Sequence, residues 1–139
     1  MRLLAFFLLL AVVVACSSYG SAGANRTDER PDIGRSGTEF MEVCSSIDAE
    51  WNQNPDRIRN DASCLGWVEG FADGFTVHDE LLGVPRTDRI ACIPHKVTTI
   101  QTVRAMKKYI SDHPEKAHRP TRYVVSLALA QAFPCKAGK

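Results

Sequence analysis

Apolar residues recur at the three- and four-residue spacing of an amphipathic helix in four separate segments of the chain. The first begins after Ser36, which is followed three residues later by Glu39 and therefore fits a capping box. This helix is expected to end before the loop at residues 52–55. Its apolar face consists of Phe40, Val43, Cys44 and Ile47. The second helix is expected at about residues 61–80, with Cys64, Val68, Phe71 and Phe75 on its apolar face.

Two further helices follow a loop at residues 81–97 that contains glycine and proline. Thr98 and Gln101 form a second capping box, and the third helix runs from there to about Asp112. The fourth begins near Pro120, since the first turn of a helix tolerates proline, and ends before Pro134. No segment alternates convincingly with period two. The sequence therefore predicts an all-α fold, a compact bundle of about four helices, with two antiparallel hairpins as its simplest form.

Three glycines, Gly66, Gly70 and Gly74, recur on one line along the second helix. Each lowers helix stability by about 1 kcal/mol relative to alanine, so something is expected to pack closely against this line. We expect another helix of the same chain there, with a second copy of the chain as the alternative. The last helix is apolar almost all round between Val124 and Phe133, which is typical of a helix buried on several sides or shared with a partner. These two helices are the candidates for forming a homodimer.

The N-terminus has the pattern of an export signal. A positive start at Arg2 is followed by an uninterrupted apolar stretch from Leu3 to Ala15. A membrane-spanning helix needs about 20 apolar residues, so this stretch is too short to be one. We interpret residues 1–15 as a signal peptide and expect a periplasmic protein.

Two cleavage sites compete. Val13-Val14-Ala15-Cys16 resembles a bacterial lipobox, which predicts that Cys16 is acylated and anchors the protein to a membrane. Ala22-Gly23-Ala24 is an ordinary small-x-small site and leaves a periplasmic protein that begins near Asn25. Residues 16–35 are interpreted as a flexible tether, residues 36–135 as the folded domain and residues 136–139 as a short tail.

Charge and cysteine content narrow the class of protein. The chain holds 17 Lys and Arg against 16 Asp and Glu and contains no basic run, which argues against a nucleic acid or an anionic membrane surface as partner. Contact with a membrane is expected only through the lipid anchor. Apart from Cys16 the chain has four cysteines, an even number that suits two disulfides in an oxidising compartment. They are Cys44, Cys64, Cys92 and Cys135.

Four cysteines allow three connectivities. In a helical hairpin the end of one helix lies beside the start of the next. Antiparallel neighbours therefore bring Cys44 to Cys64, and Cys92, before the third helix, to Cys135, after the fourth.

Candidate chemistry is sparse. His78-Asp79-Glu80 is the densest cluster of catalytic residue types, but neighbours on a helix point in different directions, so a solvated helix end is the preferred interpretation. His95, His113 and His118 match no standard zinc spacing. Nucleophile-elbow, phosphate-loop and metalloprotease motifs are missing from the sequence. We expect no catalytic residue, no metal and no cofactor.

Five ordered motifs nevertheless resemble those of one family. They are Ser36-Gly37-x-x-Phe40-x-x-x-Cys44, Cys64-x-Gly66-x-x-x-Gly70-x-x-Asp73, Cys92-Ile93-Pro94-x-x-Val97-Thr98-x-x-Gln101, Tyr109-x-x-x-His113-Pro114-Glu115 and Ala128-Leu129-x-x-Ala132-Phe133-Pro134-Cys135. Together they make residues 36–135 similar to the Rap/Tai family of type VI secretion immunity proteins. The resemblance implies a small periplasmic all-helical protein, often dimeric, that binds and blocks a peptidoglycan amidase injected by a neighbouring cell.

The resemblance also implies that loops enter the amidase cleft, without assigning them to positions of this chain. Two polar loops flanked by helices are the candidates, residues 81–90 and residues 113–119. Their cationic side chains are the expected anchor residues: Arg86, Arg89, Lys116 and Arg119. Three other readings stay open: an envelope lipoprotein that binds another protein, a periplasmic acid-stress chaperone, and a small enzyme around His78.

Overall fold

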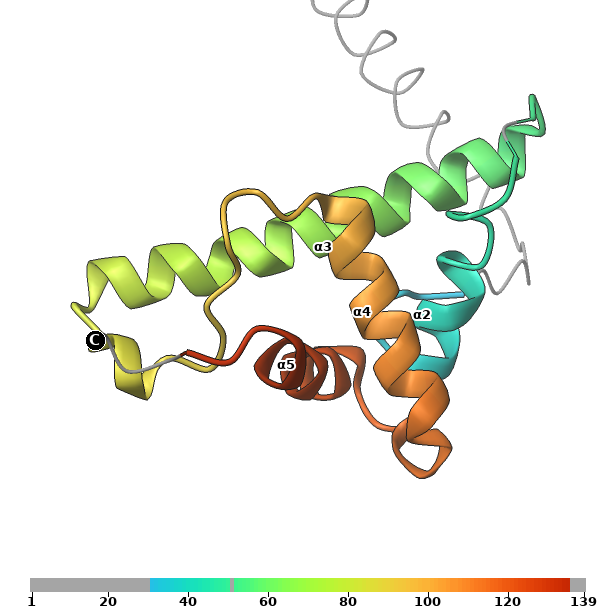
Figure 1. Cartoon of the computed structure of the whole chain (residues 1–139). Helices are drawn as coiled ribbons and strands as arrows, with labels where there is room; N and C mark the ends of the chain where they lie inside the picture. Colours follow the sequence, from blue (N-terminus) through green and yellow to red (C-terminus); the bar gives the residue numbers. More distant parts are fainter. Residues whose placement is uncertain (1–30, 51, 136–139) are drawn as a thin grey trace, which may run out of the picture. The chain divides into compact units, whose positions relative to one another are not determined.

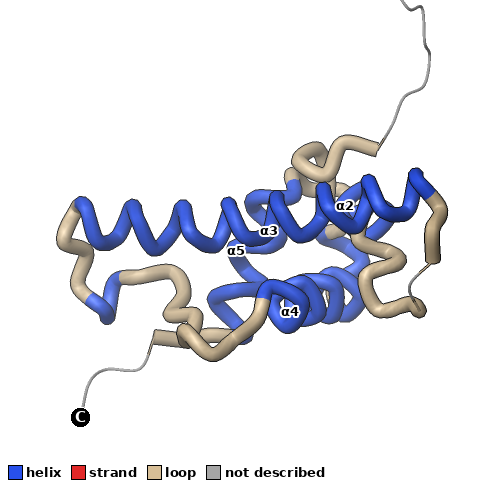
Figure 2. The backbone as a smooth tube through the Cα atoms, turned by 90° about the horizontal axis from the view of Figure 1, so that it is seen from above, coloured by secondary structure: helices blue, strands red, loops and turns tan. Residues whose placement is uncertain are grey.

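The computed structural model describes residues 31–50 and 52–135. The folded unit begins at Pro31. Its α-helices are α2 (Gly37–Val43), α3 (Pro55–Leu81), α4 (Thr99–Asp112) and α5 (Thr121–Ala132), and its short 3₁₀ turns are η1 (Arg86–Asp88) and η2 (Pro114–Lys116). The described residues contain no β-strand (Figure 2). The predicted all-α fold is confirmed.

The first helix, α2, is shorter than predicted. Ser36 caps it as expected, because its Oγ accepts a hydrogen bond from the Glu39 N–H at 3.3 Å. The Glu39 carboxylate, however, forms an ion pair with Arg35 at 3.1 Å instead of completing the capping box. The helix ends at Val43, and turns replace its predicted continuation. Lys107, on α4, donates a hydrogen bond from Nζ to the Cys44 carbonyl at 3.1 Å, so this carbonyl has a partner without a longer helix.

The second helix, α3, starts at Pro55, about one and a half turns before the predicted start. Asn54 is its N-cap, and the Asn54 side chain accepts hydrogen bonds from the backbone N–H groups of Asp56 and Arg57 at 2.9 and 3.2 Å. Proline suits the first helical position, where its missing N–H leaves no hydrogen bond unmade. The Asn-Pro pair was therefore a helix-start signal, and assigning it to a loop was wrong.

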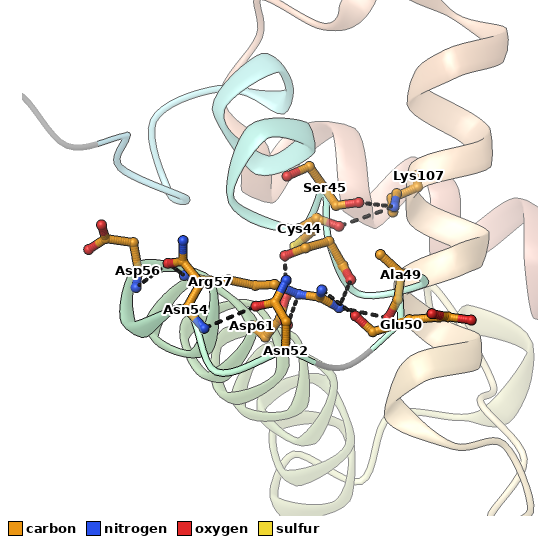
Figure 3. Close-up of polar contacts among 11 residues, drawn as sticks. Cys44, Ser45, Ala49, Glu50, Asn52, Asn54, Asp56, Arg57, Asp61 and Lys107 are labelled. Atoms are coloured by element: carbon orange, nitrogen blue, oxygen red, sulfur yellow. Dashed lines mark hydrogen bonds and ion pairs between the residues drawn. The ribbon is translucent and has the colours of Figure 1, made fainter.

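Arg57 clamps the turn after α2 to the start of α3 (Figure 3). Its guanidinium donates to the carbonyls of Ser46 at 3.2 Å, Ala49 at 2.6 Å and Glu50, and pairs with the Asp61 carboxylate at 3.5 Å. Nearby, α4 contacts the same turn, because Arg104 donates from Nε to the Asp48 carboxylate at 2.7 Å. This hydrogen bond lowers the pKa of Asp48 below its ordinary value.

The core lies between α2, α4, α5 and the N-terminal half of α3. Its fully buried or nearly buried apolar residues are Phe40, Val43, Cys44, Cys64, Val68, Val103, Met106, Tyr109, Ile110, Val124, Val125, Ala128 and Leu129. The capping box at the start of α4 forms with both of its hydrogen bonds. The helices cross steeply, with α4 and α5 running across the direction of α3 (Figure 1). Two antiparallel hairpins therefore do not describe the packing.

Both predicted disulfide pairings are confirmed. Cys44–Cys64 joins the end of α2 to α3, and Cys92–Cys135 joins the segment before α4 to the segment after α5. Beside the second disulfide, the Cys92 N–H donates to the carbonyl of Phe133 at 2.8 Å. The first disulfide therefore fixes the N-terminal helix to α3, and the second fixes the C-terminal segment to the segment that precedes α4.

The start of the folded unit includes residues that the sequence assigned to the tether. Residues 31–35 form a turn, and Ile33 is partly buried against the core. The signal peptide, the lipidation site at Cys16, the rest of the tether and the tail at 136–139 lie outside the described residues. Among the helices of the described part, none is both long and apolar enough to cross a membrane.

Candidate partner-binding site

The C-terminal half of α3 projects past the core. The helix has 27 residues, which corresponds to about 40 Å, and its end extends beyond α4 and α5 (Figure 1). After Val68 the only buried residue of α3 is Asp79. Segment 82–90 then turns back along the helix. We call residues 69–90, which comprise this half of α3 and the returning segment, the arm.

Exposed apolar side chains gather on the arm. The largest exposed fractions among the described large apolar residues are those of Leu81, at 80%, and Leu82, at 67%. Val77 and Ile90 are also about half exposed. An exposed apolar patch rimmed by polar residues is typical of a protein interaction site, so this end of the molecule is the candidate contact surface.

A groove of about 600 Å³ runs between α3 and the returning segment. Phe71 and Phe75 on α3 form one apolar wall, and Val84 and Ile90 form the opposite one. The other lining residues are Gly70, Gly74, His78, Asp79 and Asp88. This volume is in the range of ligand-binding clefts in proteins.

The glycine line on α3 is open to solvent. Gly66, Gly70 and Gly74 are exposed, and a Cβ atom built on any of them meets nothing within 4 Å. The prediction that another helix of this chain packs against the line is therefore wrong. Each glycine lowers helix stability by about 1 kcal/mol, and no internal packing compensates for it. What Gly70 and Gly74 provide is a groove floor without side chains.

A series of aromatic contacts connects the groove to the core. The ring of Phe40, in the core, lies edge-on to Trp67 with centroids 6.0 Å apart. Trp67 stacks on Phe71 at 4.9 Å, and Phe71 meets Phe75 edge-on at 5.0 Å. Such pairs favour fixed ring geometries, so the apolar wall of the groove on α3 is held in place from the core.

The returning segment is fixed to α3 by two sets of contacts. Gly83 adopts φ of 60°, and the Val84 N–H donates to the Asp79 carbonyl at 2.8 Å, which is the glycine-terminated helix end known as a Schellman motif. Arg89 then donates from Nε to the Val84 carbonyl at 3.2 Å and lies 4.0 Å from the Asp79 carboxylate. We call the contacts of Arg89 with Val84 and Asp79 the latch.

The latch changes the interpretation of two sequence predictions. Asp79, which the sequence placed in a solvated helix end, is buried, whereas its neighbours His78 and Glu80 are exposed as predicted. Nδ1 of His78 lies 3.1 Å from the Asp79 carboxylate. Arg89, predicted to contact a partner, instead has its guanidinium directed into the protein. Arg86, on η1, is exposed on the same arm and remains available as a contact residue.

The second candidate loop, residues 113–119, is part of the scaffold. The Ala117 carbonyl accepts the Thr38 N–H at 2.9 Å, and the Arg119 carbonyl accepts the Gly37 N–H at 3.1 Å, so the loop caps the start of α2. Lys116 donates to the Tyr109 hydroxyl at 3.1 Å, and this hydrogen bond raises the pKa of Lys116.

The two candidate loops do not form one contact surface. The loop at residues 81–90 follows the projecting end of α3, whereas the loop at residues 113–119 lies at the far end of α4, on the other side of the molecule (Figure 1). Arg119, in the second loop, stacks over the Tyr123 ring at 5.5 Å. Of the two, only the first loop borders the groove.

The histidines do not assemble a metal site in the described residues, where no group of three or more potential ligands is close enough to hold an ion. His95 precedes α4 and lines a separate cleft of about 290 Å³ with Glu69 and Asp73. His113 follows α4, at its opposite end, where its ring lies 4.3 Å from that of Tyr109. The arrangement of side chains on the arm supports binding by shape and apolar contact.

The fold and this surface define a disulfide-bonded helical binding protein. The family model of the Rap1a immunity proteins matches residues 36–135, which include all four described α-helices and both disulfides. The chain therefore belongs to the Rap1a immunity protein family, and the predicted Rap/Tai resemblance is confirmed. Membership assigns it an immunity role with an effector protein as partner. No curated protein and no solved structure matches the chain.

Proposed function

We propose that this immunity protein binds and occludes a peptidoglycan amidase delivered by a type VI secretion system, and that it does so without chemistry of its own. The observation that carries the proposal is the arm, which projects an apolar groove and an exposed loop beyond a stapled core. The apolar patch on it suits a protein surface better than a small polar substrate. Family membership supplies the immunity role, and the motif resemblance supplies the amidase as target class.

The periplasm is the proposed compartment. Disulfides persist in oxidising compartments, and Cys44–Cys64 and Cys92–Cys135 are both formed. The apolar stretch at the N-terminus supports export. Acylation of Cys16 anchors the protein to a membrane in this proposal, whereas cleavage before Asn25 releases it. Mass spectrometry of the mature N-terminus distinguishes the two forms.

Occlusion requires a rigid element that can be presented to a cleft. The arm meets this requirement because the aromatic contacts fix one wall of its groove and the latch fixes the other. Arg86, exposed on η1, is the proposed contact cation. Lys116 donates to the buried Tyr109, so we expect its truncation to act through stability. Arg119 is exposed and lies over the half-exposed Tyr123, away from the groove.

Co-expression tests the proposal. An amidase effector encoded beside the gene is directed to the periplasm of a test bacterium, with or without the full-length protein. We expect lysis without the protein and growth with it. A version that starts at Asn25 and lacks the export signal is the matched control and should not protect, because it stays apart from the effector. If no neighbouring amidase is toxic, or if the exported protein neither binds nor protects, the amidase proposal is wrong.

Self-association belongs to the proposal as a homodimer. The buried face of α5 is used by the core, since Val124, Val125, Ala128 and Leu129 are covered within one chain. The glycine line on α3 stays open, and its part outside the groove, at Gly66, is the surface that this proposal leaves for a second copy. Light scattering at high micromolar concentration measures the oligomeric state, and a monomer there contradicts the homodimer.

A further inference from the structure

We propose that the groove on the arm binds an apolar segment of the effector that carries a lysine or arginine. This inference rests on the proposed function and adds the surface and the chemistry of the partner. It differs from occlusion by a loop alone, because here the immunity protein also receives a part of the effector. Three observations support it: the bare floor, the apolar walls and the charge of the groove.

The floor of the groove allows close approach. Gly70 and Gly74 lie on it, and a Cβ atom at either position meets nothing within 4 Å. Glycine is favoured where a backbone must come close to a ligand, and it is unfavourable inside a helix. Because no part of the described chain uses this space, a contact from outside the chain is the physical reason for keeping both glycines.

The walls of the groove suit an apolar occupant. Phe71 and Phe75 face Val84 and Ile90 across the groove, whose volume is about 600 Å³. Ile90 is about half exposed. Protein grooves of this kind receive the apolar face of a helix or of an extended segment, whose side chains then leave water. The exposed Leu81 and Val77 continue the apolar surface beyond the groove along the same end of α3.

The charge of the groove selects a cation on the occupant. The charged side chains that line it are both carboxylates, Asp79 and Asp88. Asp79 is engaged by the latch, whereas Asp88 is exposed, and within the described residues its carboxylate accepts a hydrogen bond from its neighbour Thr87, at 3.0 Å. Between Arg59 and Arg86 the chain contains no lysine or arginine. A lysine or arginine beside the apolar segment therefore finds the exposed carboxylate of Asp88, and no lysine or arginine is among the residues that line the groove.

The glycine line supplies its own matched control. Gly70→Leu and Gly74→Leu fill the groove, whereas Gly66→Leu adds the same side chain on the same line of α3 outside the groove. Affinity for the purified amidase effector is measured by biolayer interferometry with the full mature chain. We expect each groove variant to weaken binding at least about 30-fold, and Gly66→Leu to change it less than about threefold. Thermal unfolding verifies that all three variants are folded.

A charge reversal tests the cation. Asp88→Arg should weaken binding about tenfold and reduce its salt dependence, because it removes the exposed carboxylate of the groove. Glu42→Arg, at an exposed position on α2, is the control and should bind as the wild type does. If Asp88→Arg also binds as the wild type does, the occupant carries no cation and the stated chemistry is wrong.

The remaining outcomes separate this inference from the proposed function. If the wild type binds the effector and all three leucine variants bind equally well, the groove inference is overturned while the proposed function stands. If Gly66→Leu weakens binding as much as the others, the groove is not the contact. If the groove variants retain effector binding but convert a dimer into a monomer, the occupant is a second copy and our assignment is wrong. If the wild type binds no neighbouring amidase, the proposed function fails and this inference fails with it.

Discussion

The two halves of α3 belong to one continuous helix but have opposite surroundings. Up to Val68, the helix is joined to the core by the Cys44–Cys64 disulfide, by the Arg57 clamp and by buried side chains. Beyond Val68, the arm has one buried residue on the helix, the open glycines Gly70 and Gly74 and an apolar groove. The first half provides stability, and the second half provides an accessible surface.

This difference shows how a small domain can expose apolar surface without losing its fold. Only the half of α3 that is tied to the core has to support the native structure, so the arm is free to carry residues that lower helix stability. The latch and the aromatic contacts then keep the arm in one conformation. Substitutions in the two halves should consequently differ in size, and some should differ in sign.

Removal of the Cys44–Cys64 disulfide should have the largest effect. The double substitution Cys44→Ser with Cys64→Ser releases a constraint between cysteines separated by 20 residues and should lower the free energy of unfolding by about 3 kcal/mol. Both cysteines are fully buried, so the serines add buried polar groups as well. Urea unfolding under non-reducing conditions measures the loss. A loss below about 0.5 kcal/mol would mean that α2 is held to α3 without the disulfide.

Arg57→Met should have the next largest effect on stability. The substitution keeps much of the side-chain volume but removes the hydrogen bonds to the carbonyls of Ser46 and Ala49, and a hydrogen bond to a charged group contributes about 1.5–3 kcal/mol. We expect a loss of about 2 kcal/mol in urea unfolding, with effector binding unchanged. Arg59→Met, at an exposed position on the same helix, is the control and should have little effect.

Arg89→Met should act locally on the arm. The variant leaves the Asp79 carboxylate without its cation, and we expect a loss of about 1 kcal/mol because the pair is partly exposed. The characteristic result is faster hydrogen exchange over segment 82–90, with the core unchanged. Arg86→Met, on the same segment, should leave hydrogen exchange as in the wild type. If segment 82–90 of Arg89→Met exchanges at the wild-type rate, the Schellman motif at Gly83 fixes the segment without the latch.

Gly66→Ala and Gly74→Ala should have the smallest effects, and these should have the opposite sign. Alanine is favoured over glycine in a helix by about 1 kcal/mol, and its Cβ meets no other atom at these positions. Each variant should therefore raise the free energy of unfolding by up to about 1 kcal/mol in urea unfolding. Destabilisation by either alanine would contradict the open glycine line and restore the tight intramolecular packing predicted from the spacing.

Much of the scaffold was predictable because its signals are local. The Ser36 cap and the capping box at Thr98 involve residues within one helical turn. As predicted, the side chains of Ser36 and Thr98 each accept a hydrogen bond from the backbone N–H three residues later. The start of α3 was missed although Asn54-Pro55 carried the signal. The disulfide pairing was predicted from the order of the helices, and it is correct although Cys64 lies well inside α3 and not near its start.

The site was less predictable because it depends on which surfaces the fold leaves uncovered. The sequence by itself determined the helices, most of their ends, the disulfide partners and the family. Only the tertiary structure decided that the glycine line is open, that Arg89 faces inward and that Phe71, Phe75, Val84 and Ile90 enclose a groove. Spacing places residues on one face of a helix, because helix geometry is fixed within a few residues. Whether that face meets another helix or solvent depends on how distant segments cross, and local interactions do not determine this.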